Sequence, residues 1–328
     1  MALPSQTEEF DDIVTSTLQF FVPGEADQTI KDNPVLNLFM SNKKEEGMGK
    51  QIEFIVTYGD NNSVDWAESS TQTYKFSPSS VMTKGKIKPA LLTGHVLWSL
   101  EEKEQNSGDE QIADLAESKM EQLRSTFDRK LSVAFYSNGT VNGKRCISGL
   151  RSWVSTSTGT VAGINDSTYQ WWQPKFKTGA GLWSQYGWFG SLGNIPLWMF
   201  INVSDGGRKP DVILSDHGTF QVFLNGLGTG VRYIDEKMFT NPGGALDLSF
   251  MGARYVYDKY CPTGTMYFLH TRDWRFYVSP GMNFTVLPVD RIYDAPMMSY
   301  SFMVLRCQLV CLRRNLQGVV TGWTTPTF

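Results

Sequence analysis

The sequence predicts a mixed α+β fold, and three observations support this prediction. Segments with β-branched and aromatic residues in period two recur along the chain, beginning with KQIEFIVTYG from Lys50. One long stretch, from about Asp109 to Tyr136, instead repeats apolar residues every three or four positions, as a helix requires. The length of 328 residues suffices for one large domain or two smaller ones with a sizeable core.

The first 45 residues predict an irregular arm. Pro4, Pro23, Gly24 and Pro34 interrupt them too often for a long helix or a strand in a sheet core.

The stretch that begins at Gly49 predicts a long β-hairpin. Its arms run from Lys50 to about Asp60 and back from about Thr71 to Lys88, with the turn-rich DNNS near the tip. At about 3.3 Å per residue, with the tip included, the hairpin reaches roughly 50 Å. A compact domain of this size has a radius of gyration of only about 20 Å. The hairpin is therefore expected to protrude.

The periodic stretch predicts a single helix from about Asp109 to Tyr136, which would be close to 40 Å long at about 1.5 Å per residue. Ser107 and Glu110 have the spacing of a capping box before it. Asn138 and Gly139 follow it as a stop signal.

The second half of the chain predicts several strands and one further helix. KPDVILSDHGTFQVFLNGL, from Lys209, is typical of a buried strand, a polar turn and a helix. ARYVYDKYCPTGTMYFLHTRDWRFYV, from Ala253, predicts two strands joined across Pro262 and Gly264. PMMSYSFMVLRCQLVCLRRNLQGVV, from Pro296, predicts a long strand or a strand pair.

Charge and cysteine content exclude some classes of protein. The net charge of −3 argues against tight, sequence-specific DNA binding, which depends on a basic excess. The four cysteines have no CxxC spacing, and Cys307 and Cys311 would stand about 13 Å apart on a strand, too far for a disulfide. Free thiols in a reducing compartment are expected. Without a signal-peptide pattern or an 18-residue apolar run, we expect a soluble protein that is not secreted by the usual route.

No group of residues predicts a catalytic or metal site. His95, His217 and His270 are scattered without metal-ligand spacing. Ser215 and Asp216 precede His217, but adjacent residues cannot form a hydrolase triad, and no GxSxG surrounds the serine. A turn in which Ser215 or Asp216 caps a helix is the better interpretation.

Two glycine motifs and one acidic run also predict no cofactor or active site. GLGTG, from Gly226, lacks the context of a dinucleotide fingerprint, and GTVNGKR, from Gly139, is one residue short of a phosphate loop. Glu101, Glu102 and Glu104 are interpreted as a solvated charge run. The chain is therefore expected to be no enzyme and to bind no cofactor.

Five short segments occur in an informative order between the predicted elements. They are SNGT at Ser137 to Thr140, GLRSWV at Gly149 to Val154, GINDSTYQWW at Gly163 to Trp172, PDVILSDHGTF at Pro210 to Phe220, and RRNLQGV at Arg313 to Val319. In this order, with the arm, the hairpin and the long helix before them, the chain resembles the major capsid proteins of tailed bacteriophages, which have the Hong Kong 97-like fold. The likeness covers nearly the whole chain.

The resemblance implies a division of the chain into named parts. These are an N-terminal arm (1–45), an extended loop (46–95), a peripheral domain with a spine helix (96–154), an axial domain (155–290), and strands returning to the peripheral domain (291–328).

The resemblance also implies a structural function. Many copies, as hexamers and pentamers, would form an icosahedral shell around double-stranded DNA in the virion, assembled in the host bacterial cytoplasm. The short arm leaves no room for a fused scaffolding domain, so a separate scaffolding protein is implied, with a portal and decoration proteins as further partners. No loop lysine, among Lys75, Lys84, Lys86 and Lys88, is identified as a cross-linking residue. An encapsulin-type compartment is the nearest alternative.

The aromatic segment INDSTYQWWQPKF, from Ile164, allows two interpretations. Tyr169, Trp171 and Trp172 would suit either a ligand platform or a buried patch, because both remove aromatic surface from water. The resemblance places the segment at the entry to the axial domain, which favours packing and contact roles. The ligand platform would instead belong to a Trp-rich carbohydrate-active protein.

The hairpin is electrically polarised. Its tip carries Asp60, Asp65 and Glu68, whereas lysines gather at its root, so the tip is expected to lie over a basic surface of an adjacent subunit. Val64 and Trp66 would supply most of the affinity, because exposed ion pairs contribute only about 0–1 kcal/mol each. The candidate receiving residues are Lys119, Arg124, Arg129 and Lys130 on the long helix, and Arg313 and Arg314 on the last strands.

Overall fold

The computed structural model describes residues 33–61, 64, 66, 80–99, 101–102, 115–178, 195–226 and 248–322. Its helices and sheets confirm the predicted α+β class. The predicted capping box of Ser107 and Glu110, the start of the long helix near Asp109, and most of GLGTG lie outside these residues. Among the helices of the described part of the chain, none is long and apolar enough to cross a membrane.

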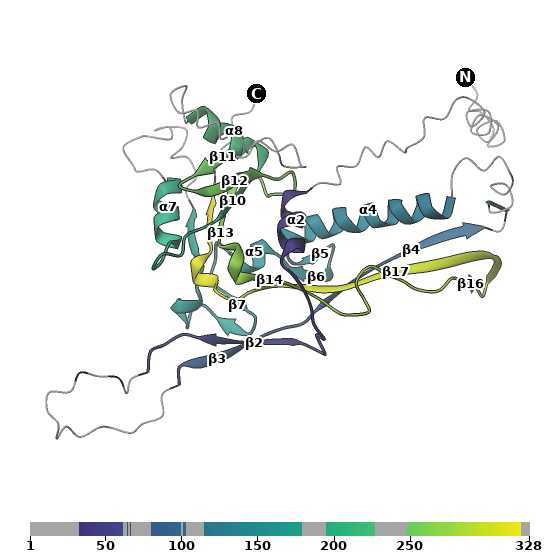
Figure 1. Ribbon diagram of the computed structural model, residues 1–328, viewed down its shortest axis with the longest axis horizontal. Coiled ribbons are helices and arrows are strands. Elements are labelled where there is room, and N and C mark those ends of the chain that lie inside the picture. The colour runs from purple at the N-terminus through teal and green to yellow at the C-terminus, as the bar shows by residue number, and fades with distance from the viewer. Residues whose placement is uncertain are drawn as a thin grey trace.

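The first sheet is built around one long strand, β17 (Ala295–Cys311). On one side β17 pairs with β4 (Ala90–Ser99) over ten residue pairs, and the two form a ribbon that extends away from the rest of the subunit (Figure 1). Four shorter strands complete the sheet: β1 (Lys43–Glu45), β14 (Trp274–Val278), β15 (Thr285–Val286) and β16 (Asp290–Ile292).

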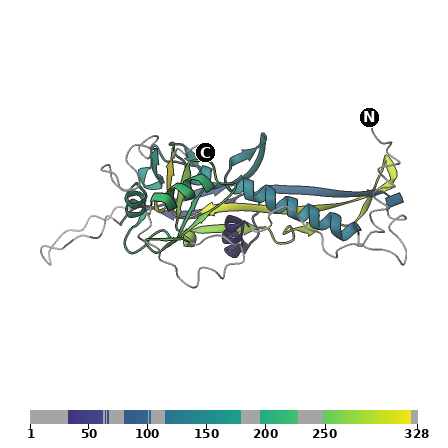
Figure 2. The same cartoon turned by 90° about the horizontal axis from the view of Figure 1, so that it is seen from above.

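Helix α4 (Leu115–Phe135) lies along one face of this ribbon (Figure 2). A Cβ atom at Gly94 of β4 would approach the side chains of Phe127 and Leu123 within 2.8 Å, so the glycine permits close packing of helix on strand. The helix ends one residue before the predicted end.

A short helix, α2 (Pro34–Ser41), packs against both α4 and β14. The Asn33 side chain accepts a hydrogen bond from the Val35 N–H, and Pro34 occupies the first turn, which are ordinary signals for a helix start. The ring of Phe39 lies 4.9 Å from that of Phe135 and 5.6 Å from that of Trp274.

The second sheet has the strand order β11-β12-β10-β13-β18-β9. Its strands are β9 (Lys175–Thr178), β10 (Val212–Ser215), β11 (Leu248–Phe250), β12 (Ala253–Tyr257), β13 (Thr265–Leu269) and β18 (Gly318–Thr321). Helices α7 (Ile195–Val203) and α8 (His217–Gly226) accompany it (Figure 1). The predicted buried strand and following helix are confirmed as β10 and α8.

The segment from Ala253 contains the two predicted strands, β12 and β13, which are joined across Pro262 and Gly264. The prediction of two strands is incomplete, because the segment also contains β14, which belongs to the first sheet. Strand β10 lies between β12 and β13 and pairs with both. The last segment contains one long strand, β17, in the first sheet, followed by the short β18 in the second.

Short elements connect the two sheets and carry the predicted protrusion. They are β2 (Ile52–Thr57), β3 (Met82–Ile87), β5 (Asn138–Val141), β6 (Lys144–Ser148), α5 (Leu150–Trp153), β7 (Thr160–Val161), β8 (Ile164–Asn165), and the 3-10 turns η1 (Gln170–Trp172), η3 (Thr271–Asp273) and η4 (Arg314–Leu316). Strands β2 and β3 form the predicted hairpin, which projects from the subunit in Figure 1. The hairpin ends at Ile87, because β4 already belongs to the first sheet.

Candidate inter-subunit surface

The root of the hairpin is anchored by aromatic packing. Phe54 of β2 is buried, and its ring lies 6.3 Å from that of Trp153 and 6.2 Å from that of Trp172. On the facing strand, a Cβ atom at Gly85 would come within 2.4 Å of the Phe54 ring. Any larger residue at position 85 would displace the ring. Strands β2 and β3 are therefore closely packed against each other and against Trp153 and Trp172.

A second contact fixes the outer part of the root. The ring of Tyr58 stacks on Trp171 at 4.7 Å with an interplanar angle of 11°, and the Tyr58 hydroxyl donates to the Ser80 carbonyl at 2.7 Å. The Lys86 N–H donates to the Ala162 carbonyl at 2.8 Å. The hairpin is therefore held at its base by the segment 149–178.

These contacts decide between the two interpretations of the aromatic segment. Trp172 is buried, and its indole N–H donates to the Val161 carbonyl, while Trp171 is covered by Tyr58. Tyr169 remains partly exposed beside Trp171. The tryptophans are packing residues of the hairpin root and not a platform open to a ligand.

Beyond the root, the hairpin presents apolar side chains to solvent. Trp66 is 93% exposed and Val64 is 83% exposed. Asp60 is also exposed, whereas Asp65 and Glu68, the other tip acids of the prediction, lie outside the described residues. Two large exposed apolar groups close together indicate a contact surface.

The basic residues on α4 differ in their availability. Lys119 is engaged, because its ammonium group lies 2.9 Å from Glu102 and donates to the Leu97 carbonyl at 3.3 Å. The guanidinium of Arg124 lies over the Phe284 ring, 5.8 Å from its centroid. Arg129 and Lys130 are exposed near the end of the helix.

The prediction that Arg314 receives a neighbouring tip is wrong, because the subunit itself encloses this side chain. Arg314 and Asp166 are both 0% exposed, and Arg314 Nη1 lies 2.8 Å from Asp166 Oδ2. The same guanidinium donates to the Trp153 carbonyl and, at 3.0 Å, to Ser155 Oγ. Arg313 is half-exposed and lies 3.9 Å from Asp273.

The sequence interpretation of the acidic run also needs a correction at Glu102. Its N–H donates to Ser99 Oγ, and its carboxylate accepts from the Ser99 N–H, both at 3.1 Å, which is a reciprocal capping box. The hydrogen bond from Lys119 is the main cause that lowers the pKa of Glu102. The spacing of Ser99 and Glu102 already indicated a capping box in the sequence. The adjacent Glu101 and Glu104 made the segment resemble an ordinary charge run.

A larger apolar surface, not anticipated from the sequence, covers one face of the β4/β17 ribbon. Directly opposed residues of an antiparallel pair share a face, and the pairs Leu91 with Arg306 and His95 with Phe302 lie on the face away from α4. We call this the outer ribbon face. Its exposed apolar residues are Leu91, Leu97, Met298 and Phe302. The sequence of β4 alone did not reveal this surface, because Leu91 and Leu97 alternate with the polar Thr93, His95 and Ser99 on the same face.

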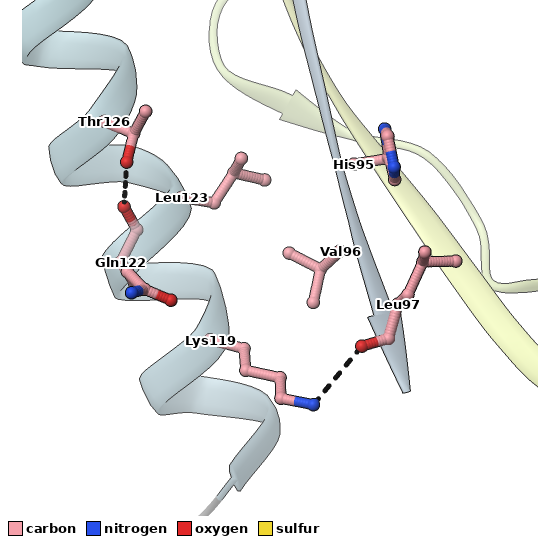
Figure 3. A pocket seen from close by; sticks show the side chains of 7 residues that line it. All are labelled: His95, Val96, Leu97, Lys119, Gln122, Leu123 and Thr126. Atoms are coloured by element: carbon pink, nitrogen blue, oxygen red, sulfur yellow. Dashed lines mark hydrogen bonds between the residues drawn. The ribbon is translucent and has the colours of Figure 1, made fainter. Parts of the chain in front are cut away.

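A groove of about 300 Å³ opens between α4 and β4 on the inner side of the ribbon (Figure 3). Val96 and Leu123 point toward each other across it, whereas the side chain of His95 lies on the other side of β4. Lys119 spans the groove to reach Leu97. Its lining mixes the apolar Val96, Leu97 and Leu123 with polar residues, and its cation, Lys119, is already paired with Glu102.

Ser215, Asp216 and His217 are the residue types of a hydrolase triad, but they do not form a catalytic site. Ser215 is fully buried and Asp216 caps α8, accepting hydrogen bonds from the N–H and hydroxyl of Thr219. His217 is exposed, with its ring beside Tyr257. Within the described ranges, no group of three or more His, Cys, Asp or Glu could hold a metal ion.

The four cysteines are free, as expected. Burial raises the pKa of each thiol, to about 12 for Cys307 and well above its usual value for Cys261 and Cys311. These thiols stay protonated at neutral pH and are poor nucleophiles.

Comparison with solved structures identifies the fold. The chain is similar to a capsid protein of cyanophage A-1(L), with 16% identity, a TM-score of 0.71, and coverage of 93% of this chain and 96% of that one. It is similar to the capsid protein of a native GTA particle, with 12% identity, a TM-score of 0.62, and coverage of 98% and 100%. The SrpI encapsulin of Synechococcus elongatus PCC 7942 matches with 12% identity, a TM-score of 0.60, and coverage of 100% and 98%.

No protein-family model matches the sequence. No curated protein matches it either. At these identities the structural likeness shows the fold alone, and it covers nearly the full length of both partners in each comparison. The chain therefore has the fold of tailed-phage capsid proteins, as the sequence resemblance implied.

Proposed function

We propose that this protein is a major capsid protein, many copies of which close into an icosahedral shell around double-stranded DNA. The observation that carries the proposal is the hairpin, which is anchored at its root and whose described outer residues Trp66 and Val64 are 93% and 83% exposed. An isolated two-stranded hairpin is marginally stable in water, so its outer part needs a neighbouring surface. The shared fold with capsid proteins supports the same conclusion.

Multiple weak contacts suffice for such an assembly. An interaction of about −4 kcal/mol corresponds to only millimolar affinity for one pair of subunits. A subunit held by several neighbours gains effective concentration at each further contact. The outer ribbon face and the hairpin tip offer two separate surfaces for this purpose.

The hairpin tip is proposed to dock on the exposed end of α4 in an adjacent subunit. Arg129 and Lys130 offer positive charge there, and Lys119 and Arg124 are already engaged within their own subunit. Asp60 would contribute to register, while Val64 and Trp66 would supply most of the affinity.

The chain is proposed to have no enzymatic activity, and its partners are proposed to be copies of itself, a separate scaffolding protein, a portal and decoration proteins. A structural protein needs no nucleophile or metal, and the buried, protonated thiols and the capping role of Asp216 fit this proposal. An activity abolished by one substitution at Ser215, His217 or a carboxylate would contradict it.

The test is assembly of the purified chain, alone and with a scaffolding partner, followed by sedimentation and negative-stain microscopy. We expect closed particles of megadalton size. The matched variant replaces residues 61–78 with a short Gly-Ser turn and keeps Tyr58 and Ser80, so that the root survives. This variant should fold and fail to close shells. A wild-type chain that stays monomeric at high concentration with its scaffold present would refute the proposal.

The encapsulin likeness supports a second candidate function, an enzyme-loaded compartment. The content of the purified particles distinguishes the two. Double-stranded DNA inside supports the phage capsid, and a protein cargo without DNA supports the compartment.

A further inference from the structure

One end of the second sheet gathers positive charge. Strands β10 and β12 are parallel and begin at this end, and β13, antiparallel to β10, ends there. The residues before β10, at the start of β12 and after β13 therefore meet. We call this surface the basic sheet end, and its cationic residues are Arg208, Lys209, Arg254, Arg272, Arg275 and Arg313.

Three of these cations, Arg208, Arg275 and Arg313, lie near one buried carboxylate, Asp273. Asp273 lies 2.9 Å from His270 Nδ1 and 3.9 Å from Arg313 Nε, and the charges of Arg208 and Arg275 also act on it. One carboxylate cannot balance the arginines around it. The excess positive charge therefore faces outward.

The other acids nearby offset only part of this positive charge. Asp211, which accepts hydrogen bonds from the N–H and hydroxyl of Thr271, keeps its negative charge, and Asp205 is an exposed acid on the adjoining loop, so the cations still outnumber the carboxylates. Five of the six cations of the basic sheet end are exposed, and Arg275 is partly buried. Arginine, with its planar fork of donors, suits carboxylates as partners.

The chain itself contains a segment of opposite charge. Residues 1–32 hold seven carboxylates and one lysine, a side-chain charge of −6, whereas the whole chain carries −3, so the other 296 residues carry +3. Four of the seven lie within five positions: Glu8, Glu9, Asp11 and Asp12. The segment also has apolar residues beside these acids, such as Phe10 and Ile13.

The attachment point brings this segment within reach. It joins the described chain at Asn33, where α2 begins, and Phe39 of α2 contacts Trp274, the neighbour of Arg275. Adding the length of α2 and of the intervening side chains places Asn33 at most about 35 Å from Arg275. A random coil of about 21–25 residues, the number between the acidic run and Asn33, has a root-mean-square span of about 26 Å and a contour of about 80 Å.

We infer that the acidic segment 1–32 docks on the basic sheet end of its own subunit, through carboxylate–arginine pairs. Tethering favours the subunit's own segment, because its effective concentration is millimolar or higher while that of a free neighbour is set by dilution. The inference goes beyond the proposed function and holds for an unassembled subunit whether or not shells form.

The test is zero-length cross-linking of the full chain at low concentration with a water-soluble carbodiimide, which joins a carboxylate to a lysine amine as an amide and leaves as its urea. Peptides are mapped by mass spectrometry. We expect cross-links from Glu8, Glu9, Asp11 or Asp12 to Lys209, and none to Lys144, which is exposed at the β5–β6 turn and is not part of the basic sheet end. Raising the salt from about 50 to about 500 mM should lower the yield.

Matched variants separate docking from general attraction. Arg208→Gln/Arg313→Gln keeps the reacting groups and should lower the Lys209 cross-link about three- to tenfold, since each exposed pair contributes modestly. Arg129→Gln/Lys130→Gln removes the same charge from α4 and should leave the yield unchanged. Equal effects of the two double variants, or equal cross-linking of Lys209 and Lys144, would overturn the inference.

An equal mixture of ¹⁴N- and ¹⁵N-labelled chains identifies which copy supplies the segment. Docking within one subunit gives cross-linked pairs that are wholly light or wholly heavy. Pairs of mixed isotope would overturn the inference in favour of a neighbouring copy. If Arg208→Gln/Arg313→Gln weakens binding of a short DNA duplex without changing the cross-link, the basic sheet end is a phosphate surface and the inference fails.

Discussion

The junction between the two sheets buries its large side chains, whereas the outer ribbon face exposes apolar ones. At the junction, Trp153, Trp172, Trp274 and Arg314 are fully buried, and Arg314 is paired with Asp166. On the outer ribbon face, Leu91 is 57% exposed in an equally regular strand. The junction residues are buried by their own subunit, whereas the ribbon leaves apolar surface exposed to solvent. Stability of the subunit and its association are therefore expected to depend on different residues.

The largest loss of stability should follow from Arg314→Met. Removing the guanidinium leaves the buried Asp166 without its cationic partner, which typically costs about 3–5 kcal/mol. Urea unfolding of the unassembled subunit measures this loss. The double variant Arg314→Met/Asp166→Leu should recover much of it, because no unpaired charge remains. The neighbouring Arg313→Met, at a half-exposed site, should change the free energy of unfolding by at most about 1 kcal/mol. A similar loss of unfolding free energy for Arg314→Met and Arg313→Met would contradict the claim that the buried ion pair stabilises the junction.

A smaller loss is expected at the hairpin root. Gly85→Ala places a methyl group within 2.4 Å of the Phe54 ring, and overpacking of this kind costs about 1–3 kcal/mol. Gly47→Ala is the control, because nothing lies within 4 Å of its Cβ position. Thermal unfolding compares the two. A Gly85→Ala protein as stable as Gly47→Ala would mean that the root is loosely packed.

The buried carboxylate Asp258 should make the stability of the subunit depend on pH, which gives a further test of the buried region. Burial is the main cause that raises its pKa, against hydrogen bonds from the Tyr260 N–H and the Tyr136 hydroxyl. The folded chain thus holds this proton more tightly than the unfolded chain. The stabilising contribution is complete below the unfolded pKa of about 3.8 and is lost as pH rises through the raised folded pKa. The loss amounts to about 1.4 kcal/mol for each pH unit that separates the folded from the unfolded pKa.

Asp258→Asn removes this titration. The difference in unfolding free energy between wild type and variant should therefore change between about pH 3.8 and the raised folded pKa, and stay constant at higher pH. Glu102, whose pKa is lowered by Lys119, provides the opposite case at the surface. A difference that does not vary across the window would contradict the burial argument.

The smallest effect on the subunit is expected for Leu91→Ser on the outer ribbon face. The exposed side chain contributes little to folding, so the free energy of unfolding should change by less than about 1 kcal/mol. Particle formation should nevertheless fall, because a polar group then lies in the proposed contact. Thr93→Ser, on the same face, is the matched control. Loss of folding with Leu91→Ser would show that the ribbon face belongs to the subunit's own core.

Local patterns predicted much of the fold, because they report on local forces. The period of apolar residues predicted α4 to within one residue at its end, and the strand-turn-helix from Lys209 predicted β10 and the cap of α8. The β2–β3 pairing was also predicted, since its arms are adjacent in sequence.

Features that depend on distant partners were not predictable in this way. Arg313 and Arg314 are adjacent, and only the position of Asp166, 148 residues away, decides which is buried. The insertion of β10 between β12 and β13 likewise depends on a strand about 40 residues earlier. Of the predicted contact set, Arg314 is excluded, and the remaining residues stay a prediction.

The long pairing of β17 with β4 has a mechanical consequence. Its hydrogen bonds run across the strands, so a force along β17 loads all ten residue pairs together, and they must fail at once. A force that spreads the tip of the β2–β3 hairpin instead opens its six pairs one after another. The ribbon is therefore loaded in shear and the hairpin is opened pair by pair. The β4–β17 pairing should withstand a higher force than the β2–β3 pairing.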